Sequence, residues 1–237
     1  MGEMMKKDKC VAVVLAAGKG KRMGSDVPKQ YIELDNKPVV SYSLQIFQKS
    51  EVIDEIILVT GKDEIEYCRT NIVFKYGLSK VTNIIEGGKE RYDSVYKALQ
   101  SIRSCDFVFI HDGARPFIEE EIISKLYQAV KEYQACVVGV KTKDTVKIAN
   151  QEGWIASTPN RDLIWNVQTP QVFAYGLIKA AYEQLMNNGC ENVTDDAMVV
   201  ENMLHKKVKL VEGNDQNIKV TTPFDLIIAN AFIRIKK

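Results

Sequence analysis

Residues 10–29, which read CVAVVLAAGKGKRMGSDVPK, decide how the rest of the chain is organised. The apolar run at 11–15 stops abruptly at Ala16, Ala17 and Gly18. A continuous apolar run that ends at glycine is typical of a buried strand in a parallel sheet. Because Gly18 and Gly20 carry no Cβ atoms, the backbone N–H groups of the following loop can approach a ligand closely.

The loop after this strand is rich in cations: Lys19, Lys21, Arg22 and Lys29. Cations and small residues at the carboxyl end of a first parallel strand indicate a polyphosphate site, although a glycine-rich surface turn with solvated charges is the alternative. The glycine spacing excludes the dinucleotide fingerprint G-x-G-x-x-G, and no Gly-Lys-Ser/Thr triplet forms a P-loop. The pattern L-A-A-G-x-G-x-R-M followed by Pro-Lys instead resembles the signature of nucleotidyltransferases that act on sugar and polyol phosphates.

The composition is that of an ordinary globular protein of 237 residues, with 46% hydrophobic residues, 27% charged residues and a net charge of +1. This balance indicates neither a nucleic-acid partner nor a membrane surface, so the cation cluster is better explained as a small-anion site. Five scattered cysteines without C-x-x-C spacing favour buried thiols in a reducing cytoplasm over a disulfide or zinc framework. The polar first nine residues and the short apolar runs predict neither a signal peptide nor a membrane span.

Strands and helices are expected to alternate as far as residue 140. Apolar runs predict strands at 11–15, 55–60, 81–85, 107–111 and 136–140. Amphipathic segments predict helices at 38–47, 63–76, 91–102 and 119–133. This alternation is typical of an α/β fold with a mostly parallel central sheet and helices on both faces.

The alternation breaks at residues 141–165, which contain short extended pieces and no helical period. This segment is too long for an ordinary connection, so it is either a functional loop or an arm that packs against another molecule. Beyond it we expect a short extended piece at 171–173, helices at 176–188, 195–204 and 223–235, and closing strands at 208–212 and 218–220.

Polar and small residues follow the predicted strands at the edge where open α/β sheets bind ligands. Gly88 and Ser94 follow the third strand and are suited to hold a flat base, although an ordinary capped turn fits equally well. Asp112 leaves the fourth strand and is placed to hold Mg²⁺, because Mg²⁺ prefers one or two carboxylates together with phosphate oxygens. An Asx-turn or helix cap is the alternative for Asp112. We expect His111 to pack and hydrogen-bond, since phosphoryl chemistry needs no histidine.

Two further candidates remain open on pattern alone. Lys219, in the segment NIKVT, is either a solvated edge charge or an inward-facing anion ligand. Thr194, which opens TDDA, either caps the following helix or also belongs to a phosphate site at that helix N-terminus.

Seven motifs occur together and in order: LAAGKGKRMG, PKQY, EGGKERYDSV, HDGARPF, QTPQVF, TDDA and NIKVT. This set resembles the 2-C-methyl-D-erythritol 4-phosphate cytidylyltransferase family of the non-mevalonate isoprenoid pathway. The resemblance implies transfer of a cytidylyl group from CTP to methylerythritol phosphate, with Mg²⁺ or another divalent cation and with release of pyrophosphate. It also implies one Rossmann-like nucleotidyltransferase domain over residues 1–237, and a homodimer in which an arm at about 140–160 crosses to the partner.

The resemblance also implies roles for individual residues. Catalytic cations would be Arg22, Lys29 and Lys219. Nucleotide contacts would come from Ala16, Ala17, Gly18, Gly88, Ser94 and Asp112, and Asp112 would also lie near the metal. The polyol phosphate would contact Arg115, Thr169, Thr194 and Lys219, together with Arg161 of the opposite subunit. The chain departs from the common family pattern at Lys89, Gly113 and Asn160, which weakens any side-chain role at those positions.

The implied chemistry needs no general base, because a phosphate monoester has a second pKa of about 6 and is already largely ionised at neutral pH. A sister cytidylyltransferase acting on ribitol 5-phosphate is the nearest alternative. Ala16-Ala17-Gly18 and Asp93-Ser94-Val95 favour methylerythritol phosphate over that acceptor. A non-catalytic nucleotide-sensing module is a second alternative, which the presence of Arg22, Lys29 and Asp112 together disfavours.

Overall fold

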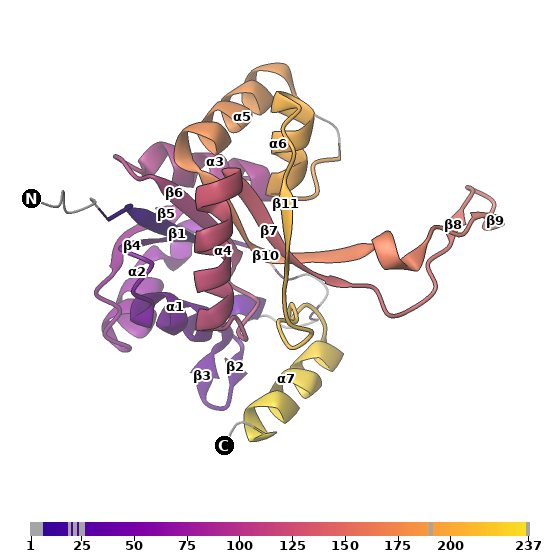
Figure 1. Ribbon diagram of the computed structural model, residues 1–237. Helices are drawn as coiled ribbons and strands as arrows, with labels where there is room; N and C mark the ends of the chain where they lie inside the picture. The colour runs from indigo at the N-terminus through magenta and orange to yellow at the C-terminus, as the bar shows by residue number, and fades with distance from the viewer. Residues whose placement is uncertain (1–6, 19, 21–22, 24–26, 190–191, 236–237) are drawn as a thin grey trace, which may run out of the picture.

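The computed structural model describes residues 7–18, 20, 23, 27–189 and 192–235. Its centre is a seven-stranded sheet in the order β11-β7-β10-β6-β1-β4-β5 (Figure 1). The strands are β1 (Cys10–Ala16), β4 (Glu55–Thr60), β5 (Val81–Glu86), β6 (Phe107–Asp112), β7 (Ala135–Lys141), β10 (Trp165–Ala174) and β11 (Lys209–Glu212). β10 runs antiparallel to both of its neighbours, and every other neighbouring pair is parallel. The predicted mostly parallel α/β sheet is therefore confirmed.

Helices cover both faces of this sheet. α1 (Val39–Lys49) and α4 (Glu120–Tyr133) pack on one face, and α3 (Arg91–Ser101), α5 (Tyr175–Asn188) and α6 (Asp196–Leu204) pack on the other. Strand β1 contributes Ala12 and Val14 to the first core and Val11 and Val13 to the second. A strand buried on both faces needs apolar side chains in both directions, which explains the unbroken apolar run in its sequence.

The piece predicted at 171–173 is only a part of the ten-residue strand β10. The register with β7 shifts between Val167 and Gln171, and Pro170 lies within that shift. A bulge and a proline interrupt the alternation of side chains that is typical of a long strand. The full length of β10 could therefore not be recognised from the sequence pattern.

The strand predicted at 218–220 is not formed, and this segment joins no sheet among the described residues. Instead, the N–H of Val220 donates to the carbonyl of Ala114, 2.8 Å away, in the loop that follows β6. The segment pairs with a loop by a backbone hydrogen bond and not with the edge of a strand. Lys219 is thereby placed over the carboxyl end of β6.

The remaining elements depart little from the sequence prediction. Pro38 is the residue before α1, one position earlier than predicted, because β3 (Lys37–Pro38) pairs with β2 (Glu33–Leu34). The irregular helix predicted at 63–76 is a 3₁₀ turn (Lys62–Glu64), α2 (Ile65–Tyr67) and a π-helical turn (Cys68–Phe74). The terminal helix α7 (Pro223–Ile235) packs by Ala229 against a small third core. Within the described residues, no helix has the length and apolar character needed to cross a membrane.

The segment predicted as an arm does project from the body of the protein (Figure 1). It carries the two short strands β8 (Ile148–Ala149) and β9 (Ile155–Ser157), which pair with each other, and then the 3₁₀ turn Arg161–Leu163. Large apolar side chains on it face solvent, with Trp154 72% exposed and Ile155 64% exposed.

Candidate active site

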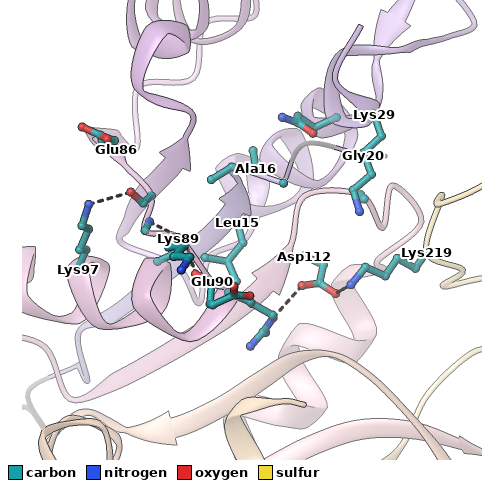
Figure 2. A pocket seen from close by; sticks show the side chains of 18 residues that line it. Leu15, Ala16, Gly20, Lys29, Glu86, Lys89, Glu90, Lys97, Asp112 and Lys219 are labelled. Carbon is teal, nitrogen blue, oxygen red and sulfur yellow. Dashed lines mark hydrogen bonds and ion pairs between the residues drawn. The ribbon is translucent and has the colours of Figure 1, made fainter. Parts of the chain in front are cut away.

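A cavity of about 850 Å³ opens at the carboxyl ends of β1, β5 and β6 (Figure 2). Its walls come from the loop after β1, the turn between β5 and α3, the end of β6 and the extended segment that carries Lys219. Of the predicted site residues, those that line this cavity are Ala16, Ala17, Gly18, Lys29, Gly88, Ser94, Asp112 and Lys219. Arg22, with Lys19 and Lys21, lies outside the described residues.

The turn between β5 and α3 forms one wall and is tightly packed. Ser94 Oγ accepts from the N–H of Gly88 at 2.9 Å and donates to the carbonyl of Glu90 at 3.1 Å. A Cβ atom on Gly88 would lie 2.1 Å from Cβ of Asp93, so no larger residue fits there without a shift. The Ser94 hydroxyl therefore orders this turn at the cavity wall.

The opposite wall holds one carboxylate among three cations. Asp112 Oδ2 lies 2.7 Å from Lys219 Nζ and 3.8 Å from Arg115 Nε, and its Oδ1 lies 3.4 Å from Arg91 Nε. Burial opposes ionisation of Asp112, but Arg91, Lys219 and Arg115 hold the pKa of its carboxyl well below the usual range. Figure 2 shows the Asp112 carboxylate and the Lys219 ammonium pointing toward one another. Lys219 is therefore an inward-facing cation and not a solvated edge charge.

His111 and Thr169 lie behind Asp112 and hold it in place. Thr169 Oγ1 accepts from the N–H of Asp112 and lies 3.0 Å from His111 Nδ1, while His111 Nε2 lies 3.1 Å from the carbonyl of Arg115. Burial lowers the pKa of His111 to about 4, so this side chain is neutral at neutral pH. His111 packs and hydrogen-bonds as expected, and Thr169 is not among the residues that line the cavity.

Arg115 is half-buried beside the same cluster and does not line the cavity. Its Nη1 donates to the carbonyl of Asn217 at 2.7 Å, which fixes the chain just before Lys219. Its Nε atom is buried and has no hydrogen-bond partner among the residues that the structure describes. The Gln30 side chain lines the cavity and is also buried, and neither of its polar atoms has a hydrogen-bond partner within the described part of the chain. These atoms supply unused hydrogen-bonding capacity beside the cavity.

Two predicted residues lie away from the cavity. Thr194 is exposed, and the cap of α6 is Asp195, whose carboxylate accepts from the N–H of Met198 at 2.9 Å. The idea that Thr194 caps this helix is therefore wrong, since Asp195 has the extended backbone that a capping residue requires. Arg161 lies exposed on the arm, where it donates to the carbonyl of Lys143.

Comparison with known proteins identifies the family. The family model described as 2-C-methyl-D-erythritol 4-phosphate cytidylyltransferase matches residues 10–235. The chain belongs to this cytidylyltransferase family.

Two curated relatives with that name illustrate the degree of similarity. The chain is 50% identical to the protein from Lachnospira eligens over 224 residues, which cover 94% of this chain and 98% of the relative. It is 51% identical to the protein from Clostridium perfringens over 226 residues, which cover 95% and 99%. Among solved structures, a 4-diphosphocytidyl-2C-methyl-D-erythritol synthase from Anaerococcus prevotii superposes with a TM-score of 0.86 at 35% identity, covering 99% of this chain and 100% of that one.

The residues present in this member of the cytidylyltransferase family fit a magnesium ion that is shared with phosphate. Among the described residues, no group of three or more His, Cys, Asp or Glu side chains gathers as a metal centre. Asp112 is an ionised carboxylate at the cavity wall, and among the described residues its Oδ1 is engaged by the long 3.4 Å contact with Arg91 alone. One carboxylate with remaining acceptor capacity, completed by phosphate oxygens, is the ligand set that Mg²⁺ prefers.

Arg91 and Asp196 were not among the site residues predicted from the sequence. Arg91 lines the cavity, and its two Nη atoms contact the two carboxylate oxygens of Asp196 at 2.8 and 2.7 Å. The two consecutive aspartates of the motif TDDA are the feature of the sequence that could have indicated this pair. Only one of two consecutive aspartates can cap a helix in this way, so a second, buried aspartate needs a cation elsewhere.

Proposed function

We propose that this chain transfers the cytidylyl group of CTP to 2-C-methyl-D-erythritol 4-phosphate and releases pyrophosphate, a step in isoprenoid precursor biosynthesis. The observation that carries the proposal is the Asp112 cluster, in which one ionised carboxylate lies within 4 Å of three cations at a cavity wall. This local excess of positive charge suits the approach of a triphosphate and a second phosphate. Family membership and the names of the relatives supply the identity of the two substrates.

The reaction forms one bond and breaks one. An oxygen of the acceptor phosphate attacks the α-phosphorus of CTP, and the bond from that phosphorus to the bridging oxygen of the β-phosphate breaks. The acceptor phosphate has a second pKa of about 6, so it needs no base at neutral pH. His111 does not act as a general base, since it is buried and both of its ring nitrogens have hydrogen-bond partners.

The obstacle to this reaction is repulsion between two anions, and cations that are already in place reduce it. We propose that Arg22 and Lys29 hold the triphosphate and that Lys219 stabilises charge at the α-phosphate. The cytosine and ribose contact Ala16, Ala17, Gly18, Gly88 and Ser94. Mg²⁺, or another divalent cation, bound at Asp112 supplies further positive charge against the phosphate oxygens.

For the acceptor, we propose contacts with Arg115, Thr169, Thr194 and Lys219. Arg115 and Thr169 lie directly around Asp112, whereas Thr194 is exposed and further from the cluster.

We further propose a homodimer in which the arm of each subunit brings Arg161 to the site of the other. The exposed apolar side chains of the arm support this arrangement, and so does the place of Arg161 outside the residues that line the cavity of its own chain. In this proposal the whole chain acts as one nucleotidyltransferase domain in the cytoplasm. The free thiols of Cys10, Cys68, Cys105 and Cys136 agree with that compartment.

Pyrophosphate release tests the proposed reaction. The purified protein is incubated with CTP and Mg²⁺, together with methylerythritol phosphate, ribitol 5-phosphate or no acceptor. We expect release with methylerythritol phosphate and little with the other two. Release only with ribitol 5-phosphate would assign the chain to the sister activity. Binding of CTP without release for either acceptor would favour a nucleotide-sensing module.

Mixing two inactive variants tests the contribution of Arg161 across the dimer. Lys219→Ala and Arg161→Ala are each expected to be inactive as homodimers. In a mixed dimer, one site has the intact Lys219 of one chain and the intact Arg161 of the other. Equal mixing should therefore restore roughly a quarter of the wild-type activity, because half of the dimers are mixed and each has one complete site. No restoration after subunit exchange, itself verified with differently tagged chains, would show that Arg161 does not act across the dimer.

A further inference from the structure

Asp196, the first residue of α6, is a fully buried carboxylate outside the cavity. Its Oδ1 accepts from Arg91 Nη1 at 2.8 Å and from the hydroxyl of Tyr182 at 2.6 Å, and its Oδ2 accepts from Arg91 Nη2 at 2.7 Å. A buried carboxylate is costly unless it is paired and hydrogen-bonded, and this one is both.

Arg91 joins this buried carboxylate to the cavity. The guanidinium group is planar, so the bidentate contact with Asp196 fixes the direction of all of its N–H groups. The remaining Nε lies 3.4 Å from Asp112 Oδ1, a long contact compared with the 2.7 Å contact between Lys219 and the other oxygen of Asp112. Asp196 therefore holds Arg91 close to Asp112 without letting it form a second bidentate pair there.

Asp196 is itself held firmly by the sheet. Gln171 Oε1, on β10, accepts from the N–H groups of Asp196 and Ala197 at 2.9 Å each. Gln171 Nε2 donates to the carboxylate of Asp195 at 2.9 Å. The start of α6 is thus clamped to a central strand, and the carboxylate of Asp196 has little freedom to follow Arg91 if Arg91 moves.

We infer that Asp196 is a positioning residue for the proposed cytidylyl transfer: by holding Arg91 in a bidentate pair, it leaves Asp112 available to a divalent cation that accompanies the nucleotide. The inference rests on the proposed function for its substrate. Without the Asp196 carboxylate, the two Nη groups of Arg91 turn to the nearest anion, which is Asp112. Arg91 then competes with the cation for Asp112, while the turn at Gly88 keeps its structure.

The main test is Asp196→Asn, which keeps the size of the side chain and cannot accept a bidentate pair. We expect kcat to fall about ten- to a hundredfold, and the KM for CTP measured with Mg²⁺ to rise, because the displaced Arg91 competes with the cation that accompanies CTP. The second measurement does not use turnover. Calorimetry gives the affinity for CTP with and without Mg²⁺, and we expect the variant to lose most of the gain in affinity that Mg²⁺ confers on the wild type.

Tyr182→Phe is the matched control, because it removes a hydrogen bond from the same carboxylate and leaves the pair with Arg91 intact. A merely structural role for Asp196 predicts that the two variants behave alike in the Mg²⁺-dependent part of CTP affinity, and this result would overturn the inference. We expect only Asp196→Asn to lose that part.

If Asp196→Asn does not fold, Arg91→Lys provides the same test. It keeps the positive charge of this partly exposed side chain and removes the planar guanidinium group that forms the bidentate pair with Asp196. A normal kcat and a normal Mg²⁺-dependent gain in Arg91→Lys would also overturn the inference. Failure of the proposed function is distinguishable, because the wild-type protein would then release no pyrophosphate, whereas the comparison of CTP affinities would still separate Asp196→Asn from Tyr182→Phe.

Discussion

Asp112→Asn is the substitution whose effect follows most directly from the structure. It removes the anion that Lys219 and Arg115 share, while Arg91 keeps its pair with Asp196. Breaking a buried charge pair costs about 3–5 kcal/mol, and we expect about 3 kcal/mol here because Lys219 is 35% exposed and partly screened. The expected change is therefore a loss of about 3 kcal/mol in the free energy of unfolding without ligand.

The same substitution should change how the protein responds to an added polyanion. Pyrophosphate without metal stabilises a folded state that binds it, and the variant presents more unpaired positive charge than the wild type. We therefore expect pyrophosphate to raise the stability of Asp112→Asn more than that of the wild type. Turnover should nevertheless fall at least about a hundredfold, because the variant lacks the carboxylate that suits the metal.

Urea unfolding followed by circular dichroism, with and without pyrophosphate, measures both effects. Asp215→Asn is the control, because Asp215 forms an exposed pair with Lys143 that should contribute less than about 1 kcal/mol. If Asp112→Asn is no less stable than Asp215→Asn, or if pyrophosphate stabilises it no more than the wild type, the charge argument for this cluster is refuted.

Three further predictions concern separate parts of the chain. Lys29→Ala and Arg22→Ala should each reduce turnover at least about a hundredfold, and near-normal kcat in either would count against the proposed grip on the triphosphate. Burial raises the pKa of Cys136 to about 12 from 9.0, so its stabilising contribution is complete below pH 9 and declines as the pH rises toward 12. Between pH 8 and 10 the wild type should accordingly lose about 1.4 kcal/mol more unfolding free energy than Cys136→Ala, and equal losses would contradict this. Trp154→Ser should weaken the proposed dimer at least about tenfold in sedimentation experiments, whereas Phe74→Ser, which removes a similarly exposed side chain on the body, should not.

Much of the fold was predictable because the informative signals are local. The apolar run of β1 and its glycine-rich ending identify a buried parallel strand from adjacent residues. The cavity wall at Gly88 and Ser94 and the carboxylate of Asp112 follow from residues at strand ends, since the ends of parallel strands meet at one edge of the sheet.

What could not be predicted depends on contacts between distant segments. Lys219 was ambiguous because a lysine among apolar and β-branched residues fits either a solvated edge charge or an inward-facing anion ligand. Its partner Asp112 lies more than a hundred residues earlier in the chain. The pair of Arg91 and Asp196 is equally distant in sequence. Thr194 was considered as a helix cap because a threonine and two aspartates in a row are all good capping residues, and only the backbone conformation selects Asp195.

Strand β10, which is longer than the sequence pattern predicted, connects the parts of the proposed site. At one end of β10, Trp165 pairs with Lys141 at the base of the arm. At its bulge, Thr169 holds the N–H of Asp112 and its carbonyl accepts from Asn217, which precedes Lys219. Further along, Gln171 clamps the start of α6. Because one strand carries all of these contacts, a second chain that binds the arm would also hold the surroundings of Asp112 in place. Loss of the dimer and loss of turnover should therefore occur together in variants of the arm.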